Sequence, residues 1–136
     1  MSNITQVVNT DKHLTLLKKA VMASDLDQVL SSTGPFTFFA PSDVAFEKLE
    51  KGLLDNLLKP ENKAKLVDFL NCHVVAGKIY FKDLKDGEKI QTVNGNELLV
   101  HVKNGEVTIG AAKLKSYDAK VSNGVIHNLD TVMMKN

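Results

Sequence analysis

The stretch Ser122-Asn123-Gly124-Val125-Ile126-His127-Asn128-Leu129-Asp130 decides how the C-terminal part of this 136-residue chain folds. The pair Asn123-Gly124 favours positive φ, because Gly lacks a Cβ and Asn tolerates the left-handed region, so it predicts a turn. A β-branched residue in place of Gly124 is therefore expected to strain the backbone. The residues that follow alternate between two faces of a predicted strand, with Val125, His127 and Leu129 on one face and Ile126, Asn128 and Asp130 on the other.

A second decisive stretch reads Phe36-Thr37-Phe38-Phe39-Ala40-Pro41-Ser42-Asp43-Val44-Ala45-Phe46. Its first five residues are mainly apolar and aromatic, which predicts a short buried strand. Pro41-Ser42-Asp43 then ends the strand and begins a helix, for which Ser42 is the predicted N-cap.

The first half of the chain is otherwise predicted to be helical, because its apolar residues recur at helical spacing. Asp11 and Asp25 precede two such runs and are the predicted N-caps of their helices. Pro60 fits the first turn of a later helix, where its missing N–H costs little. The apolar positions of the predicted helices are Leu14, Leu17, Ala20 and Val21, then Leu26, Val29 and Leu30, then Val44, Ala45, Phe46 and Leu49, then Leu53, Leu54, Leu57 and Leu58, and finally Leu66, Phe69 and Leu70.

The second half shows strand-like alternation from Lys89 onward. Asn94-Gly95 and Asn104-Gly105 each separate two alternating runs, which is a strong signal for a β-hairpin. Further strands are predicted around residues 113–117 and 125–134. Helices followed by mostly antiparallel strands indicate an α+β domain.

Composition and charge limit the classes of function. A chain of 136 residues with 43% hydrophobic and 24% charged residues fits a single globular domain, residues 1–136. A net charge of +1 without long basic runs argues against binding to nucleic acid. No apolar run approaches the ~20 residues that span a bilayer, so no direct membrane span is expected. Residues 1–5 lack the basic and apolar regions of a signal peptide, which by itself predicts a cytoplasmic protein.

Together the two stretches resemble the signature segments of the fasciclin-like adhesion domain family. Between them, Leu70-Asn71-Cys72-His73-Val74-Val75-Ala76-Gly77 resembles the family's Tyr-His segment, and all three agree in order and spacing over essentially the whole chain. The resemblance implies an α+β wedge or sandwich of mainly antiparallel strands, with several helices from the N-terminal half packed against it.

The resemblance also implies a non-catalytic adhesion module that binds a protein or matrix ligand. It implies an extracellular, periplasmic or cell-surface location, with any signal peptide removed from this chain. A monomer is favoured, and no cofactor is expected.

Most residues of these segments are expected to be structural. Buried apolar side chains each contribute roughly 1.5–3 kcal/mol to folding, and buried polar side chains usually pair with other groups. We expect His127 and Asp130 to bond to neighbouring backbone and to tie the sheet to the helices. The structural signature consists of Phe39, Pro41, Asp43, Phe46, Asn123, Gly124, His127 and Asp130.

The candidate adhesive surface consists of Tyr117, Asp118 and His73. In animal matrix proteins of this family, the Tyr-His segment and an Asp-Ile pair before the second signature are linked to integrin binding. Here Cys72 replaces the Tyr and Ala119 replaces the Ile, whereas His73 and Asp118 keep their positions. These two departures argue against integrin recognition.

Two alternatives belong to other functional classes. Cys72 is the single cysteine, and as a catalytic nucleophile it needs a positioned base. His73 would point to the opposite face of a strand, so His101 or His127 would have to arrive by folding. The other alternative is a small-molecule or carbohydrate binder with a pocket between helices and sheet, although the chain has no Trp for sugar stacking. The four histidines match no metal-binding spacing, so no metal site is expected.

Overall fold

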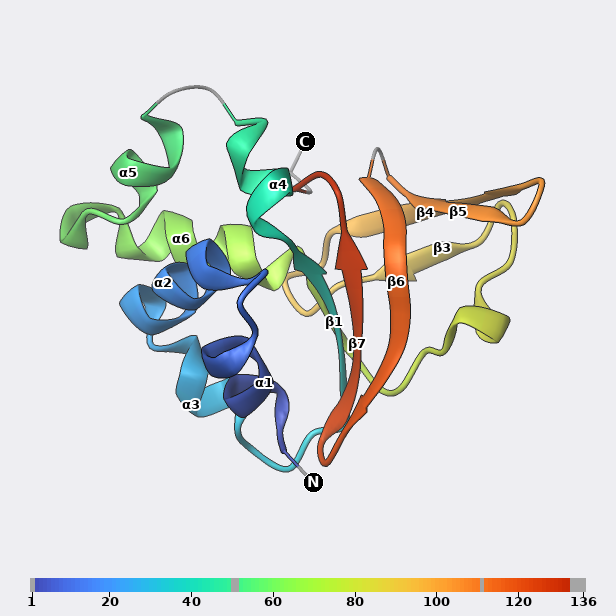
Figure 1. The fold of residues 1–136 in the computed structure, drawn as a ribbon, viewed down its shortest axis with the longest axis horizontal. Coiled ribbons are helices and arrows are strands. Elements are labelled where there is room, and N and C mark those ends of the chain that lie inside the picture. The colour runs from blue at the N-terminus through green and yellow to red at the C-terminus, as the bar shows by residue number, and fades with distance from the viewer. Residues whose placement is uncertain (1, 50–51, 111, 133–136) are drawn as a thin grey trace.

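The structure is a computed structural model that describes residues 2–49, 52–110 and 112–132. Helices from the first half of the chain pack against one side of a mixed sheet, so the predicted α+β class is confirmed (Figure 1). The helices are α1 (Ile4–Thr10), α2 (Thr15–Ser24), α3 (Leu26–Leu30), α4 (Asp43–Glu47), α5 (Leu53–Leu57) and α6 (Lys63–Asn71), with the 3-10 helices η1 (Pro60–Asn62) and η2 (Phe81–Asp83). The strands are β1 (Phe36–Pro41), β2 (Val74–Ala76), β3 (Lys89–Gln91), β4 (Glu97–Lys103), β5 (Glu106–Ile109), β6 (Ala112–Val121) and β7 (Gly124–Leu129).

The two decisive stretches of the sequence form neighbouring strands. The strands lie in the order β2-β1-β7-β6-β5-β4-β3. Strands β1 and β7 run parallel, and their register places Phe38 beside Ile126 and Phe39 beside His127. The other described pairs of strands are antiparallel, including β6 with β7 (Figure 1). Residues far apart in the chain therefore meet at the centre of the sheet.

Both Asn-Gly pairs form the hairpin turns that the sequence predicts. Strands β3 and β4 are antiparallel around Asn94-Gly95, and β4 and β5 are antiparallel around Asn104-Gly105. Asn104 has φ 54° and Gly105 has φ 80°, the positive values that favour a two-residue hairpin loop. The predicted strands at residues 113–117 and 125–134 are present within β6 and β7, although β7 ends at Leu129 and residues 133–134 lie outside the described residues.

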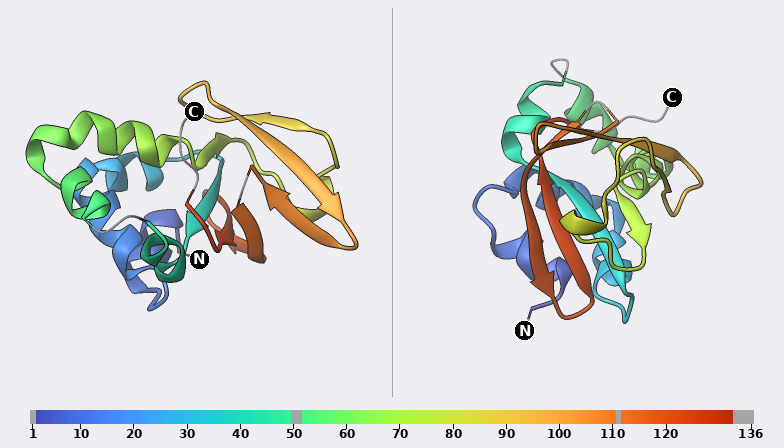
Figure 2. Two further views of the ribbon diagram at one scale, coloured as in Figure 1. Left: turned by 90° about the horizontal axis from the view of Figure 1, so that it is seen from above. Right: turned by 90° about the vertical axis from the view of Figure 1, so that its right-hand side faces the viewer.

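Apolar side chains form two cores on opposite faces of the central strands. Phe38 and Ile126 belong to the core beneath the helices, whereas Phe39 and Leu129 belong to the core enclosed by β3, β4 and β5. Ile126 and Leu129, three residues apart in β7, therefore face different cores, as the predicted alternation requires. Figure 2 shows the helices at one end of the molecule, β3–β5 at the other, and β1, β7 and β6 between them.

The three predicted N-caps form no side-chain cap on the helices assigned to them. Asp11 lies at the C-terminal end of α1, so the prediction that it caps α2 is wrong. Asp25 and Ser42 do precede α3 and α4, but neither side chain bonds to the first turn. The Asp25 carboxylate instead pairs with Lys63, and the Ser42 hydroxyl donates to the carbonyl of Leu129 at 3.2 Å. The side-chain oxygens of Asp25 and Ser42, which could have capped a helix locally, thus bond to residues that are distant in the sequence.

Helix α2 is capped from another part of the chain. Asp43 Oδ1 accepts the N–H of Leu16 at 2.8 Å, and Asp43 Oδ2 accepts the hydroxyl of Thr15 at 2.7 Å. A carboxylate at a helix N-terminus satisfies orphan donors and complements the helix dipole. Asp43 therefore fixes α2 against the start of α4.

Helix α1 is absent from the sequence-based prediction. Its N-cap is Asn3, whose Oδ1 accepts the N–H of Gln6 at 2.8 Å, while Gln6 Oε1 accepts the N–H of Asn3 at 2.8 Å. This reciprocal pair of hydrogen bonds is a capping box. The Asn-x-x-Gln spacing is therefore the feature of the sequence that could have predicted the start of α1. Among the described residues, no helix combines the length and apolar character needed to cross a membrane.

Candidate functional site

Asn123 connects the β6–β7 turn to the N-terminal helices. Its Oδ1 accepts the N–H of Ile4 at 3.0 Å, and its Nδ2 donates to the carbonyls of Leu30 at 2.7 Å and Ser32 at 2.8 Å. The backbone carbonyl of Asn123 also accepts the N–H of Phe36 at 2.9 Å. Asn123 is buried, and its bonds to Ile4 and Leu30 satisfy backbone groups in the interior. Its contacts give Asn123 a structural role.

Gly124 is required by close approach of two strands and not by a positive φ. The φ of Gly124 and that of Asn123 both lie outside the left-handed region, so the expectation of a left-handed turn at this pair is wrong. Gly124 lies beside Phe36 in the parallel register, and a Cβ on Gly124 would lie 1.9 Å from the Phe36 carbonyl oxygen. Any side chain here would separate β1 from β7.

Asp130 joins the two strands β6 and β7 at their other end. Its Oδ1 accepts the N–H of Lys113 at 2.9 Å and the hydroxyl of Thr131 at 3.1 Å. Burial raises the pKa of Asp130, but these bonds and the nearby Lys48 outweigh it and hold the pKa below its ordinary value of 3.8. The remaining signature residues lie in β1 and α4, where Phe39, Pro41 and Phe46 are buried and Asp43 caps α2.

His73 lies in the interior, which corrects its place in the candidate adhesive surface. Its side chain is fully buried, and its Nδ1 lies 3.0 Å from the carbonyl oxygen of Phe69. Burial lowers the pKa of His73 to about 4, against the raising effect of that hydrogen bond. Cys72 is also buried, with its Sγ 3.2 Å from Nδ2 of Asn94. The chain passes from α6 into β2 at this point, so both side chains enter the packed interior.

Tyr117 and Asp118 lie at a bulge in β6. The register of β6 against β7 shifts between Ser116 and Ala119, so Tyr117 and Asp118 together lie opposite the single residue His127. Asp118 has φ 60°, a left-handed value that Asp tolerates better than most residues. Such bulges bend a strand and re-aim its side chains. Here Tyr117 is 51% exposed.

His127 holds the bulge from the interior. Its Nδ1 accepts the N–H of Asp118 at 3.1 Å, so Nε2 carries the hydrogen and donates to the carbonyl of Ile79 at 2.6 Å. The ring also stacks on Phe39 with centroids 5.4 Å apart. Burial lowers the pKa of His127 below 6.5, against the raising effects of the Ile79 bond and the Asp118 charge. A neutral His127 therefore ties β7 both to the bulge and to the segment before η2.

The segment at η2 packs on the bulge from outside. Asp118 Oδ1 accepts the N–H of Phe81 at 2.8 Å, and the Phe81 ring stacks on Tyr117 with centroids 4.0 Å apart and an interplanar angle of 18°. In the right-hand view of Figure 2, η2 lies in front of the central strands. We call this region the bulge surface, and it consists of Tyr80, Phe81, Lys82, Tyr117, Asp118 and Lys120.

The bulge surface is hollowed. A cavity of about 460 Å³ is lined by Tyr80, Phe81, Lys82, Asp118 and Lys120. The ammonium group of Lys120 lies 6.0 Å from the centroid of the Tyr80 ring. The cavity thus combines aromatic faces, two ammonium groups and one carboxylate.

Sequence reasoning found Tyr117 and Asp118 but missed their neighbours around η2. Tyr80-Phe81-Lys82 is an aromatic pair followed by a cation. This local pattern is the feature of the sequence that could have indicated a binding surface at these residues. Its contact with residues 117–120 is long-range, and the bulge that creates the contact has no local sequence signature. The missed residues could therefore be placed only by the fold.

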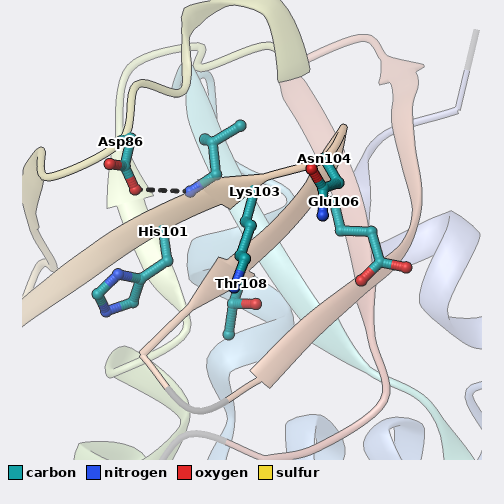
Figure 3. A pocket seen from close by; sticks show the side chains of 7 residues that line it. Asp86, His101, Lys103, Asn104, Glu106 and Thr108 are labelled. Carbon is teal, nitrogen blue, oxygen red and sulfur yellow. Dashed lines mark hydrogen bonds between the residues drawn. The ribbon is translucent and has the colours of Figure 1, made fainter.

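A larger hollow of about 700 Å³ lies over the hairpin of β4 and β5 (Figure 3). Its carboxylates already have partners, because Asp86 accepts the N–H of Val102 at 2.9 Å and Glu106 pairs with Lys113 at 3.1 Å. Within the described parts of the chain, no three His, Cys, Asp or Glu side chains gather as a group that could hold a metal ion. Apart from Val102 the described lining is polar, and it contains no Phe or Tyr: Asp86, His101, Val102, Lys103, Asn104, Glu106 and Thr108.

Known proteins share both the sequence and the fold. The family model for the Fasciclin domain matches residues 12–135. Protein sll1483 of Synechocystis sp. is 43% identical over 131 residues, which cover 96% of this chain and 72% of that protein. Transforming growth factor-beta-induced protein ig-h3 of Sus scrofa is 32% identical over 135 residues, which cover 98% of this chain and 19% of that protein.

A solved structure of a FAS1 domain pair from the insect cell adhesion molecule Fasciclin I shares the fold. It has a TM-score of 0.85 at 18% identity, over 98% of this chain and 51% of that chain. The family match and the shared fold agree with the three sequence segments. The chain therefore belongs to the fasciclin domain family.

Proposed function

We propose that this fasciclin domain is a non-catalytic module that binds a protein or matrix ligand at a cell surface or in the surrounding matrix, through the bulge surface. The observation that carries the proposal is the exposed stack of Tyr117 on Phe81, held at a bulge by Asp118 and His127. Exposed aromatic side chains on a rigid support are typical anchors of protein interfaces, because little conformational entropy is lost on binding.

The backbone at the bulge supports a binding role. A regular strand would pair Tyr117 and Asp118 with separate residues of β7, whereas here both lie opposite His127. The left-handed φ of Asp118 is an unfavourable conformation that the surrounding bonds stabilise. Bulges and backbone strain of this kind concentrate at functional sites.

The surroundings of the reactive side chains support a non-catalytic role. Cys72 is buried and lies 3.2 Å from Nδ2 of Asn94, which gives a substrate no route to its thiol. Both ring nitrogens of His127 bond to backbone groups, so the ring has no nitrogen available to act as a base. Neither group has the accessible geometry that a nucleophile and its base require.

The relatives supply the biological setting of the proposal. Fasciclin I of insects is a cell adhesion molecule, and its domain pair has the fold of this chain. This likeness supports a role at a cell surface or outside the cell. The departures at Cys72 and Ala119 from the family's integrin-linked positions favour a ligand other than an integrin.

Attachment measurements with surface variants test the proposal. Fluorescently labelled protein is incubated with intact cells and with isolated extracellular matrix of the producing organism. Tyr117→Ala combined with Asp118→Asn is expected to lower the attached amount about tenfold, the loss of a central aromatic contact. Asn keeps an oxygen that can accept the Phe81 N–H and tolerates the left-handed φ at this position.

Leu99→Ala is the matched control, because Leu99 is an exposed apolar residue on β4, 38% exposed. This variant is expected to attach like the wild type. Equal attachment of all three proteins would contradict the proposal. Melting temperatures measured on the same samples separate a loss of contact from a loss of folded protein.

A further inference from the structure

We infer that the cavity of the bulge surface binds an acidic sugar residue, a uronate, of a matrix polysaccharide. The inference rests on the proposed function, because the cavity lies within the same bulge surface and the ligand is a matrix component. It names the chemistry of that ligand, which neither the family match nor the relatives supply.

The size and walls of the cavity fit a sugar ring. Its volume of about 460 Å³ lies within the range of roughly 300–1,000 Å³ of small-molecule pockets. Tyr80 and Phe81 are partly exposed and line it, and the stack on Tyr117 holds the Phe81 ring in place. Aromatic faces suit the apolar C–H face of a sugar, so these rings perform the stacking for which the chain has no Trp.

The charges around the cavity favour an anionic ligand. Lys82 and Lys120 are exposed, and among the described residues neither forms an ion pair. The nearby carboxylates bond to backbone N–H groups and not to these lysines: Asp83 Oδ2 accepts the N–H of Tyr80 at 3.1 Å, and Asp118 Oδ1 accepts the N–H of Phe81 at 2.8 Å. Two ammonium groups are therefore available to a ligand carboxylate.

Asp118 distinguishes a uronate from a simple anion. Its carboxylate lines the cavity, and in the described structure only its Oδ1 accepts a hydrogen bond. The second oxygen can accept hydrogen bonds from sugar hydroxyls, and the charge of Asp118 repels a phosphate dianion more strongly than the single charge of a uronate. A ligand with one carboxylate, several hydroxyls and an apolar ring face matches all of these features.

Calorimetric titration of the whole chain with hexagalacturonate tests the inference. The fully methyl-esterified oligomer is the chemical control, because it keeps the rings and hydroxyls but lacks the charges. We expect binding of hexagalacturonate, with affinity about tenfold lower for the ester. Hexaglutamate with an acetylated N-terminus and an amidated C-terminus carries the same number of carboxylates without sugar rings and is expected to bind at least about tenfold more weakly.

Two double variants locate the site. Lys82→Gln with Lys120→Gln is expected to lower the affinity for hexagalacturonate about tenfold. Lys18→Gln with Lys19→Gln removes the same charge from exposed positions on α2, at the other end of the molecule, and is expected to leave affinity unchanged (Figure 1). Equal effects of the two double variants would overturn the inference, as would equal binding of hexaglutamate or no binding of hexagalacturonate.

The two proposals fail separately. If the Tyr117 and Asp118 variant loses attachment to matrix but the wild type does not bind hexagalacturonate, the uronate inference is wrong and the proposed function stands. If hexagalacturonate binds at Lys82 and Lys120 but attachment to matrix is unaffected by either variant, the proposed function is wrong and the sugar site stands.

Discussion

Strand β7 and the bulge of β6 lie side by side, but their side chains have opposite surroundings. Along β7, Ile126 and Leu129 enter the two cores, and His127 has both ring nitrogens bonded to backbone groups. Across the strand, Tyr117 and Asp118 depart from regular pairing and reach solvent. The segment that follows the family pattern supports the fold, and the irregular segment beside it forms the surface that we propose as the ligand contact.

This difference separates two kinds of substitution. Changes along β7 and its turn are expected to destabilise the whole domain, because their contacts join β1, β6 and the N-terminal helices. Changes at the bulge surface are expected to alter binding with little effect on stability.

Gly124→Ala is expected to destabilise the domain by about 4 kcal/mol or more, because the new Cβ overlaps a main-chain carbonyl where β1 and β7 begin to pair. That Cβ would lie 1.9 Å from the Phe36 oxygen. Gly95→Ala is the control, since Gly95 has φ 84° and no atom within 4 Å of an added Cβ, and about 1 kcal/mol is expected there. Urea denaturation measures both, and equal losses would show that the strands do not approach this closely.

Asn123→Ala is expected to cost about 3 kcal/mol, because it leaves two buried backbone groups and one part-buried backbone group without the Asn123 side chain as their partner. These groups are the N–H of Ile4 and the carbonyls of Leu30 and Ser32. Asn62→Ala removes hydrogen bonds at the surface and is expected to cost less than about 1 kcal/mol. Similar denaturation midpoints for the two variants would refute the role assigned to Asn123.

Stability is expected to fall in mild acid because of the buried histidines. The pKa of His73 is lowered from 6.5 to about 4, so in this interval the unfolded chain binds a proton that the folded chain does not. The contribution is complete above pH 6.5 and decreases as the pH falls through this window. His127, whose pKa is also lowered, acts in the same direction.

The expected loss from His73 is about 2 kcal/mol between about pH 7.5 and about pH 5. Denaturant titrations at the two pH values measure it. His73→Gln is expected to reduce this dependence, and His101→Gln, at an exposed position on β4, is expected to keep it. An undiminished decrease in His73→Gln would contradict the assignment to His73.

Tyr117→Ala is expected to cost only about 0.5–1 kcal/mol of stability, because the side chain is half exposed and loses chiefly its stack on Phe81. Its exposed fraction is 51%. The same substitution is expected to weaken attachment to matrix. Tyr117→Ala should thus affect binding more than stability, whereas substitutions along β7 are expected to affect chiefly stability. Thermal unfolding and the attachment assay on one preparation measure both effects, and a loss above about 3 kcal/mol would place Tyr117 among the structural residues.

The sequence predicted the parts of the fold that depend on local pattern. The Asn94-Gly95 and Asn104-Gly105 hairpins and the alternation along β7 were predicted because turn chemistry and periodicity act over a few residues. The parallel pairing of β1 with β7 has no local pattern of its own. The reason for Gly124 was therefore misread, since a glycine required by a neighbouring strand looks the same as one required by a turn.

The site was predicted less completely for the same reason. Tyr117 and Asp118 could be identified from their position before the second signature segment. Helix η2 is distant from them in the sequence and contacts them only in the folded chain. His73 was assigned to the surface because the family's Tyr-His segment suggested contact, whereas its surroundings at the end of α6 bury it. Burial depends on packing between distant segments, and a single sequence does not specify that packing residue by residue.

The measurement closest to the central claim is amide hydrogen exchange of the domain, free and bound to extracellular matrix. The contrast between β7 and the bulge predicts that binding slows exchange in peptides covering residues 78–83 and 116–120, while the hairpin of β4 and β5 is unchanged. Slowed exchange confined to that hairpin, or to the helices, would contradict a binding role for the bulge surface.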